Sequence, residues 1–299
     1  MILYEPYLKK RIDKSKPQQN IVLGDPYDLF SNFENRVSFH FFTVDNQIKP
    51  FAWKTLISDS DINITSLKKE ILAYVNIKDL ISDYSYLNKF GIELQYVVFN
   101  DNRNWTIENG SIYLVSFDIT SDESIEFSFR EFDKVSFQKF LREIQGQDMI
   151  MNKPLIYSTT ELEGYFADMC QRNLNPVGKA IFPGDVDLVI YNNNKTLSII
   201  EFKKHTKYGE GRIGDQSFLK YWFKDKKKYS GIALLTKKLN RDFFYNVIYS
   251  TKDNELNKIK IEKISSDLKL LTQKLFTCNN REEAILLVQK YIVGDINEE

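Results

Sequence analysis

The chain has 299 residues, of which 42% are hydrophobic and 27% are charged. These fractions are typical of a globular protein and exclude a disordered or fibrous chain. Basic and acidic residues balance at 41 each, so the net charge provides no general attraction to nucleic acid or to an acidic membrane. Because single hydrophobic cores rarely grow beyond about 250–300 residues, we expect two domains, residues 1–150 and 151–299.

The two cysteines, Cys170 and Cys278, lie far apart in the sequence among apolar neighbours. Such a pair is more often two buried thiols than a disulfide or a metal site, and it fits a reducing cytoplasm. The N-terminal residues contain no apolar stretch followed by small residues, and nowhere do about eighteen apolar residues follow one another. We therefore expect a soluble, cytoplasmic protein.

The first half alternates between strand and helix patterns. Aromatic and β-branched residues alternate or cluster, as they do in strands, over residues 37–44, 94–99, 111–119 and 125–129. Apolar residues keep helical spacing over residues 67–75 and 137–144. This half is predicted to be an α+β domain, and the Gly- and Pro-containing stretch 146–154 is predicted to be the linker that follows it.

The second half predicts the order helix, three strands, helix, strand. Thr159 or Thr160 is a suitable cap for the first helix. The polar turn 192–195 joins the second and third strands. The predicted helices are residues 160–173 and 214–227, and the predicted strands are residues 178–182, 185–191, 197–203 and 231–237.

Two further helices are predicted near the C-terminus. Leu268, Leu271 and Leu275 form one apolar stripe at helical spacing. A second stripe, made by Ile285, Val288 and Ile292, follows a capping box that runs from Asn280 to Glu283.

Charged residues occur at the ends of two strands that otherwise look buried. Asp185 and Asp187 precede one apolar run, and Glu201 and Lys203 end the next. Side chains alternate along a strand, so each pair shares a face, and a hairpin can bring the two pairs together. Carboxylates held close repel each other unless a cation lies between them, and Mg²⁺ prefers oxygen ligands. A lysine beside the ion could orient or help deprotonate a water that attacks phosphorus.

This stretch resembles the PD-(D/E)xK nuclease superfamily. Residues 183–187 correspond to its first signature, and Glu201-Phe202-Lys203 corresponds to the E-x-K motif, fourteen residues after Asp187. The resemblance covers roughly residues 155–240. It implies a restriction-endonuclease-like αβββαβ core, an α/β arrangement in which helices flank a mixed central sheet, preceded here by the separate α+β domain.

The resemblance also implies roles for individual residues. Asp187 and Glu201 would hold Mg²⁺, for which Mn²⁺ would substitute, together with the backbone carbonyl of Phe202. Lys203 would align the nucleophilic water. A glutamate on the first helix would complete the site, and Gln216 would assist by binding a phosphate or a water.

Two of these assignments leave an alternative open. Glu161 and Glu163 lie about 200° apart on a helix, so they cannot both face inward, and Glu163 is the preferred one. Either could instead be an exposed acid favoured by the helix dipole. Asp185 remains the alternative to Asp187.

The segment from Lys203 to Lys228 is locally basic, with nine Lys or Arg residues against three acidic ones. Such a segment would neutralise phosphates and make binding dependent on salt, although a solvated helix face is an alternative. The residues expected to contact nucleic acid are Lys204, His205, Lys207, Arg212 and Lys220. Residues 209–214 also fit G-x-G-x-x-G, but the next predicted strand ends in lysines rather than in a ribose-binding acid.

These features together predict a Mg²⁺-dependent DNA endonuclease that acts in restriction or phage defence. We expect double-stranded DNA as its substrate and a homodimer with two sites. A structure- or mismatch-specific repair nuclease is an alternative. A binding module that has lost activity and a chance match in an interaction protein are alternatives of other classes.

Overall fold

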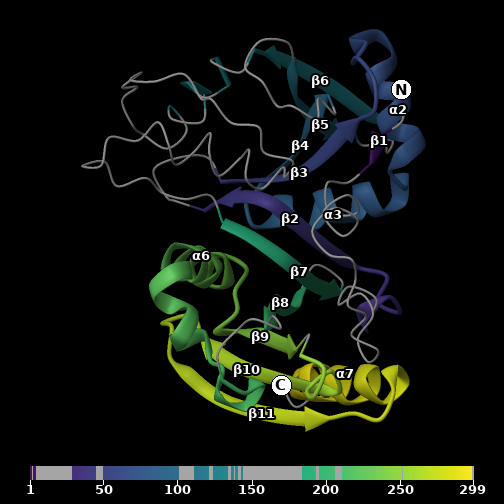
Figure 1. The fold of residues 1–299 in the computed structure, drawn as a ribbon. Coiled ribbons are helices and arrows are strands. Elements are labelled where there is room, and N and C mark those ends of the chain that lie inside the picture. Colours follow the sequence, from purple (N-terminus) through teal and green to yellow (C-terminus); the bar gives the residue numbers. More distant parts are fainter. Residues whose placement is uncertain are drawn as a thin grey trace. The chain divides into compact units, whose positions relative to one another are not determined.

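The computed structural model divides the chain into two compact units (Figure 1). Unit 1 comprises Met1–Lys16 and His40–Pro183, and unit 2 comprises Pro17–Phe39 and Gly184–Glu299. Each unit contains helices and a sheet of mixed strand direction, so the chain belongs to the α/β class. The residues that the structure describes are 1, 3–4, 29–44, 50–100, 111–120, 124–133, 136–137, 139–140, 143, 184–192, 195–205, 211–250 and 252–297.

In unit 1 the strands pair in the order β2-β3-β4-β5-β6, and β1 also pairs with β3. Strands β3 and β4 are parallel, and the other pairs are antiparallel. Helices α2 and α3 provide the crossover that a parallel pair requires. The elements are β1 (Leu3–Tyr4), β2 (Arg36–Thr43), β3 (Phe51–Ser58), α2 (Ile64–Tyr74), α3 (Ile77–Lys89), β4 (Glu93–Asn100), β5 (Ile112–Ile119) and β6 (Ile125–Phe132).

Aromatic stacking forms the centre of the unit 1 core. The Trp53 ring is fully buried, and its centroid lies 4.6 Å from that of Phe41 and 4.5 Å from that of Phe51. Phe137 packs against the same indole at 5.9 Å. The strands predicted at 37–44, 94–99, 111–119 and 125–129 and the helix at 67–75 are confirmed, whereas β3 and α3 are additional elements. The described residues between 136 and 143 are helical, as predicted.

In unit 2 the strands pair in the order β11-β10-β9-β8-β7. Strands β8 and β9 are parallel, with α6 between them in the chain, and the other pairs are antiparallel. Tyr191 N on β7 donates to Asn35 O, which places the chain just before β2 beside β7. The elements are β7 (Gly184–Asn192), β8 (Lys195–His205), the 3-10 helix η2 (Ile213–Asp215), α6 (Phe218–Lys238), β9 (Phe243–Ser250), β10 (Lys258–Ser265), β11 (Leu270–Thr277) and α7 (Arg281–Asn297).

The two faces of the unit 2 sheet carry different side chains. One face is apolar and is covered by α7, whose Val288 and Ile292 are fully buried against Ile200 and Val247 of the sheet. Because side chains alternate along a strand, the neighbouring residues of β7, β8 and β9 face the other side, where α6 packs. Tyr229 of α6 contacts Phe244 of β9 there, at 6.4 Å between ring centroids. The predicted hairpin between β7 and β8 is confirmed by the pairing of Asn192 with Lys195.

The predicted strand at 231–237 is wrong. These residues continue helix α6, and the strand follows at Phe243–Ser250. Ile232, Leu235 and Leu239 are buried at helical spacing. A short apolar run does not distinguish a buried strand from a buried helix, and Gly231 does not end the helix.

The predicted helix through Leu268, Leu271 and Leu275 is also wrong. Leu268 has a φ of 63° at the turn into β11, and Leu271 and Leu275 lie on that strand with 50% and 46% of their surface exposed. The helix that follows is confirmed as α7. Asn280 Oδ1 accepts a hydrogen bond from Glu283 N at 2.9 Å, and the Glu283 carboxylate accepts one from Asn279 N at 2.6 Å.

Several predictions concern residues outside those that the structure describes. They are the linker 146–154, Cys170, the helix 160–173 with its cap at Thr159 or Thr160, and the strand 178–182. The domain boundary at residue 150 lies in the same part of the chain and stays a prediction. Residues 29–39, by contrast, pack with the second half, where Leu29 and Phe30 are buried in the core under α7.

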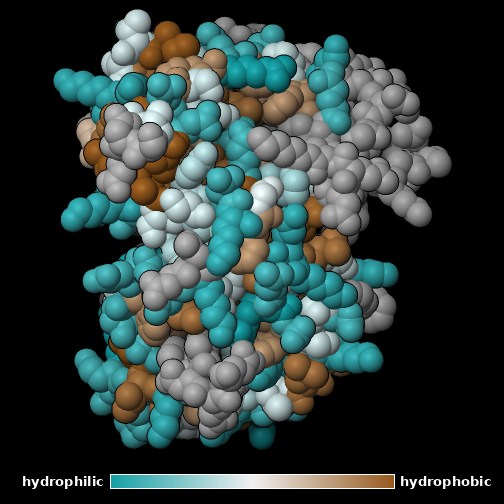
Figure 2. Space-filling view, turned by 180° about the vertical axis from the view of Figure 1, so that it is seen from behind, coloured by the Kyte–Doolittle hydropathy of each residue, from teal (hydrophilic) through white to brown (hydrophobic). Residues whose placement is uncertain are grey.

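The surface carries hydrophilic residues over much of the described area on the face drawn in Figure 2, with hydrophobic residues between them. Within the described parts of the chain, no helix has the length and apolar character needed to cross a membrane.

Helix α7 should stabilise unit 2 through its buried face. Replacing the fully buried Ile292 with Ala should lower the free energy of unfolding of unit 2 by about 2–5 kcal/mol, because it leaves a cavity. Leu286→Ala is the matched control on the same helix, where the side chain is 65% exposed, and it should cost less than about 0.5 kcal/mol. Urea denaturation measures both. Equal losses would show that α7 does not pack as described.

Candidate functional site

A row of polar side chains crosses the unit 2 sheet on the face that α6 covers. Leu188 pairs with Ile200 across β7 and β8, so Asp187 and Glu201 follow at the next position of the same ladder. Glu201 is in register with Asn246 of β9, and Asn246 is in register with Glu262 of β10. Glu201, Asn246 and Glu262 are all buried. Polar groups of this kind require partners when they are removed from water.

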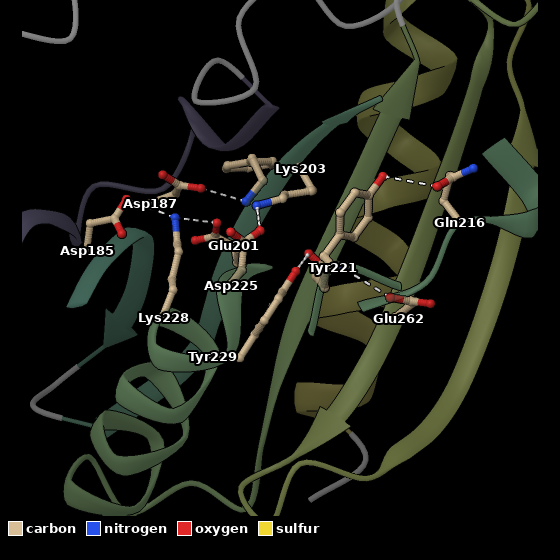
Figure 3. Close-up of polar contacts among 12 residues, drawn as sticks. Asp185, Asp187, Glu201, Lys203, Gln216, Tyr221, Asp225, Lys228, Tyr229 and Glu262 are labelled. Carbon is tan, nitrogen blue, oxygen red and sulfur yellow. Dashed lines mark hydrogen bonds and ion pairs between the residues drawn. The ribbon is translucent and has the colours of Figure 1, made fainter. Parts of the chain in front are cut away.

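Lys228 of α6 is the partner of the buried carboxylates. Its Nζ lies 2.5 Å from Glu201 Oε1 and 2.8 Å from Asp185 Oδ2 (Figure 3). Only 1% of the Glu201 side chain is exposed, against 18% for Lys228 and 31% for Asp185. The ammonium group therefore joins helix α6 to both strands of the β7–β8 hairpin.

Asp187 is held by the backbone. Its Oδ2 accepts a hydrogen bond from Phe202 N at 2.7 Å. The Phe202 side chain points to the other face, where its ring lies 6.4 Å from that of Phe30 in the core under α7. The alternation of β8 thus places the carboxylate of Glu201 on one face and anchors the strand through Phe202 on the other.

The carboxyl groups perturb one another strongly. Burial raises the pKa of Glu201 well above its usual range, and the charges of Asp187 and Asp185 raise it further, while Lys228 opposes them. Burial also raises the pKa of Asp187, an effect that Lys228 and the Phe202 N–H reduce. Although burial lowers the pKa of Lys228, the three carboxylates raise it well above the ordinary lysine value. Lys228 is therefore a permanent cation.

Two carboxylate oxygens of the polar row, Glu201 Oε2 and Glu262 Oε1, accept no hydrogen bond from the described residues, although both are inaccessible to solvent. Lys260 Nζ lies 3.6 Å from Glu262 Oε1, so Glu201 Oε2 is the oxygen available to a further cation. Oxygen ligands of this kind fit Mg²⁺, which is usually held by one or two carboxylates and keeps several waters. The described residues contain no group of three acidic, His or Cys side chains placed to hold a metal ion. Glu163 and Glu161, the predicted third ligands, lie outside the described residues.

Lys203, which the sequence predicts to align the attacking water, contacts helix α6. Its ammonium forms an ion pair with Asp225 of α6 and lies 5.3 Å from the ring centroid of Tyr221. Asp225 is the residue at which α6 kinks, with φ −112° and ψ 17°. Lys203 therefore ties β8 to the kink of α6.

Gln216 lies in the loop between η2 and α6. Its Nε2 donates to Arg212 O at 3.2 Å, and its Oε1 accepts from the hydroxyl of Tyr221 at 3.4 Å. Burial raises the pKa of Tyr221 to about 12, which keeps this hydroxyl a donor. Lys260 donates to Gly214 O at 3.0 Å and to Gln216 O, so the loop is fastened to β10. The Gln216 amide is largely engaged within its own loop.

The residues expected to contact nucleic acid differ in exposure. Lys204, Arg212 and Lys220 are exposed. His205 is buried, with Nε2 3.4 Å from Gly211 O, and burial lowers its pKa. Lys207 lies outside the described residues.

The sequence contains a signal for Lys228 that the prediction missed. Lys228, Ile232 and Leu235 recur at helical spacing, so the lysine continues the buried stripe of α6. A cation in an apolar stripe indicates a buried acidic partner. Ending the helix at residue 227 separated Lys228 from the stripe to which it belongs.

Comparisons of the chain with protein families, with curated proteins and with solved structures give no match. The resemblance to PD-(D/E)xK nucleases consequently stays a prediction from the sequence motif.

Neutralising Glu201 should stabilise unit 2, increasingly so as pH rises. A carboxyl whose folded-state pKa is raised binds its proton more tightly in the folded state. Its contribution to stability is present below the unfolded pKa, near the usual 4.5, and is lost as pH rises through the folded pKa. The free energy of unfolding of Glu201→Gln should therefore exceed that of the wild type at pH 8, and the difference should be smaller at pH 5.

Urea denaturation between pH 5 and pH 9 measures this difference. The control is Asp242→Asn, which removes an exposed carboxylate just before β9. Its free energy of unfolding should stay within about 0.5 kcal/mol of that of the wild type. A gain from Glu201→Gln that shrinks with rising pH would contradict the electrostatic account.

Proposed function

We propose that residues 151–299 hydrolyse phosphodiester bonds of DNA with the help of Mg²⁺, as an endonuclease domain of the PD-(D/E)xK type. The observation that carries the proposal is the buried Glu201 carboxylate beside Asp187. One of its oxygens is bound to Lys228, and the other accepts no hydrogen bond from a donor among the described residues. A buried charge is costly to the fold. Strongly perturbed groups that gather in one place are characteristic of active sites.

The order of elements supports the same proposal. Strands β7 and β8 form an antiparallel hairpin, α6 follows, and β9 returns parallel to β8. This is the order strand, strand, helix, strand that ends the αβββαβ core of these nucleases. The helix and the strand that would begin the core correspond to residues 160–173 and 178–182, outside the described residues.

In the proposed reaction, Asp187 and Glu201 would hold Mg²⁺, with the carbonyl of Phe202 as a further ligand. The predicted helix ligand, Glu163, lies outside the described residues. When bound, the ion polarises the phosphate and lowers the pKa of a coordinated water. The oxygen of a water forms a bond to phosphorus while the bond from phosphorus to the leaving oxygen breaks. The leaving oxygen takes up a proton and the attacking water releases one, so the net change is the addition of one water.

The exposed basic residues Lys204, Arg212 and Lys220 support a nucleic-acid substrate. Contacts of such residues with phosphates release counterions, so binding should weaken steeply with salt. Unit 1 would select the target, and a homodimer would cut both strands. Restriction or phage defence is the preferred setting, and structure-specific repair is the alternative within the same chemistry.

A cleavage assay distinguishes these possibilities. Plasmid, linear single-stranded and branched DNA are incubated with the protein in Mg²⁺, in Mn²⁺ or in EDTA. We expect cutting of double-stranded plasmid with either ion and none in EDTA. Preference for branched DNA would favour repair, and binding without cutting would indicate an inactive module and refute the enzyme assignment.

The proposed ligands should be indispensable. Asp187→Asn and Glu201→Gln should each lower the cleavage rate at least about 100-fold, the scale expected when electrostatic stabilisation of the transition state is lost. Asp242→Asn serves as the control and should cut at the wild-type rate. Full cleavage by either ligand variant would mean that the activity resides elsewhere in the chain.

A further inference from the structure

Two lysines are candidates for a role beside the carboxylates of Asp185, Asp187 and Glu201, and they have different partners. Lys228 contacts Glu201 and Asp185, whereas Lys203 contacts Asp225 and lies near Tyr221 (Figure 3). The E-x-K pattern assigns the chemistry to Lys203. On the basis of the proposed function, we propose that Lys228 is instead the catalytic lysine, and that Lys203 positions it through Asp225.

The placement of the two ammonium groups supports this exchange of roles. Lys228 bonds one oxygen of Glu201, and the other oxygen of the same carboxylate is the one left for an ion. A water bound to that ion would therefore lie close to the Lys228 ammonium. Lys203 starts two residues further along β8, a rise of roughly 7 Å, and is in register with Ile248 rather than with Asn246.

The charge balance allows Lys228 and a divalent ion to be present together. Asp185, Asp187 and Glu201 carry three negative charges when they are ionised, and one ammonium neutralises only one of them. Mg²⁺ would neutralise the other two. Lys228 therefore complements the ion, whereas Lys203 is already neutralised by Asp225 in a separate pair.

The kink in α6 explains how Lys203 acts at a distance. The backbone leaves helical geometry at Asp225, three residues before Lys228. Asp225 pairs with Lys203 and Lys228 pairs with Glu201, so both residues of α6 face β8. Holding Asp225 through Lys203 fixes the point at which α6 bends, and with it the place of the Lys228 ammonium.

In the reaction, Lys228 keeps its proton. Its ammonium donates a hydrogen bond to the attacking water or to a phosphate oxygen, where it orients the nucleophile and offsets the charge that develops in the transition state. No proton needs to leave the lysine, because the proton released by the water passes to solvent.

A set of variants separates the two roles. Lys203→Met, Asp225→Asn and the double variant test the ion pair, and K203R keeps a cation able to pair with Asp225. K228M tests the catalytic lysine. Because K228M leaves three carboxylates without their cation and could impair folding, D185N/K228M is compared with D185N. Lys237→Met is the control, since Lys237 is an exposed lysine of α6 paired with Asp267.

Plasmid cleavage in Mg²⁺ is measured for every variant, with Mn²⁺ binding as a second readout. We expect K228M, and D185N/K228M relative to D185N, to lose at least about 100-fold in cleavage rate while Mn²⁺ still binds. The cleavage rates of Lys203→Met and Asp225→Asn should each fall by about 3–10-fold. The double variant should lose no more than either single one, because all three break the same pair, and K203R should stay within about threefold of the wild type.

Opposite results would overturn the inference. If Lys203→Met and K203R abolish cleavage while Asp225→Asn cuts normally, Lys203 is the catalytic lysine. If K228M cuts at the wild-type rate, Lys228 has no catalytic role. A wild-type protein that cuts none of the DNA substrates would refute the proposed function itself, a result distinct from an altered pattern among the variants.

Discussion

The burial of the Glu201 carboxylate beside the Lys228 ammonium is the constraint that the packing of α6 on the β7–β8 hairpin has to satisfy. An isolated carboxylate inside a protein carries a desolvation penalty of several kcal/mol, and a cation in hydrogen-bonding distance offsets part of it. Glu201 has only 1% of its side chain exposed, so the fold tolerates it only if α6 delivers Lys228 to the sheet. Helix α6 accordingly directs Lys228 at both strands of the β7–β8 hairpin, and it kinks three residues earlier, at Asp225.

The two faces of the unit 2 sheet have different roles. The face under α7 is apolar and supplies the packing that holds the strands in register. The face under α6 carries the polar row from Glu201 through Asn246 to Glu262. Glu201 bonds to Lys228 of α6, Asn246 bonds to Glu262, and Glu262 bonds to the start of α6. Asn246 Nδ2 donates to Glu262 Oε2 at 3.0 Å, and Phe218 N donates to the same oxygen at 2.8 Å. The apolar layer on one side thus holds the strands in place while the other side carries buried polar groups that lower the stability of the fold. Functional sites require such rigid support.

Much of this fold could be predicted from the sequence, and the failures have physical causes. The β7–β8 hairpin and the acidic residues at its end follow from alternation and turn chemistry. The 231–237 segment was misassigned, because a short apolar run fits either a strand or a helix when the covering layer is unknown. The same error hid Lys228, whose role depends on the helix continuing past residue 227. The partner of Lys203 depends on the kink at Asp225, which no sequence periodicity indicates.

The central claim is that Asp187 and Glu201 use their remaining oxygens to bind a divalent cation, with Lys228 alongside. Anomalous diffraction from a crystal soaked in Mn²⁺ tests it most directly. The account predicts one strong peak within about 2.0–2.3 Å of Glu201 Oε2 and of an Asp187 oxygen, the usual range for hard cations bound by oxygen, with the Lys228 contact to Glu201 Oε1 retained. A crystal saturated with Mn²⁺ that shows no peak between these carboxylates would contradict it.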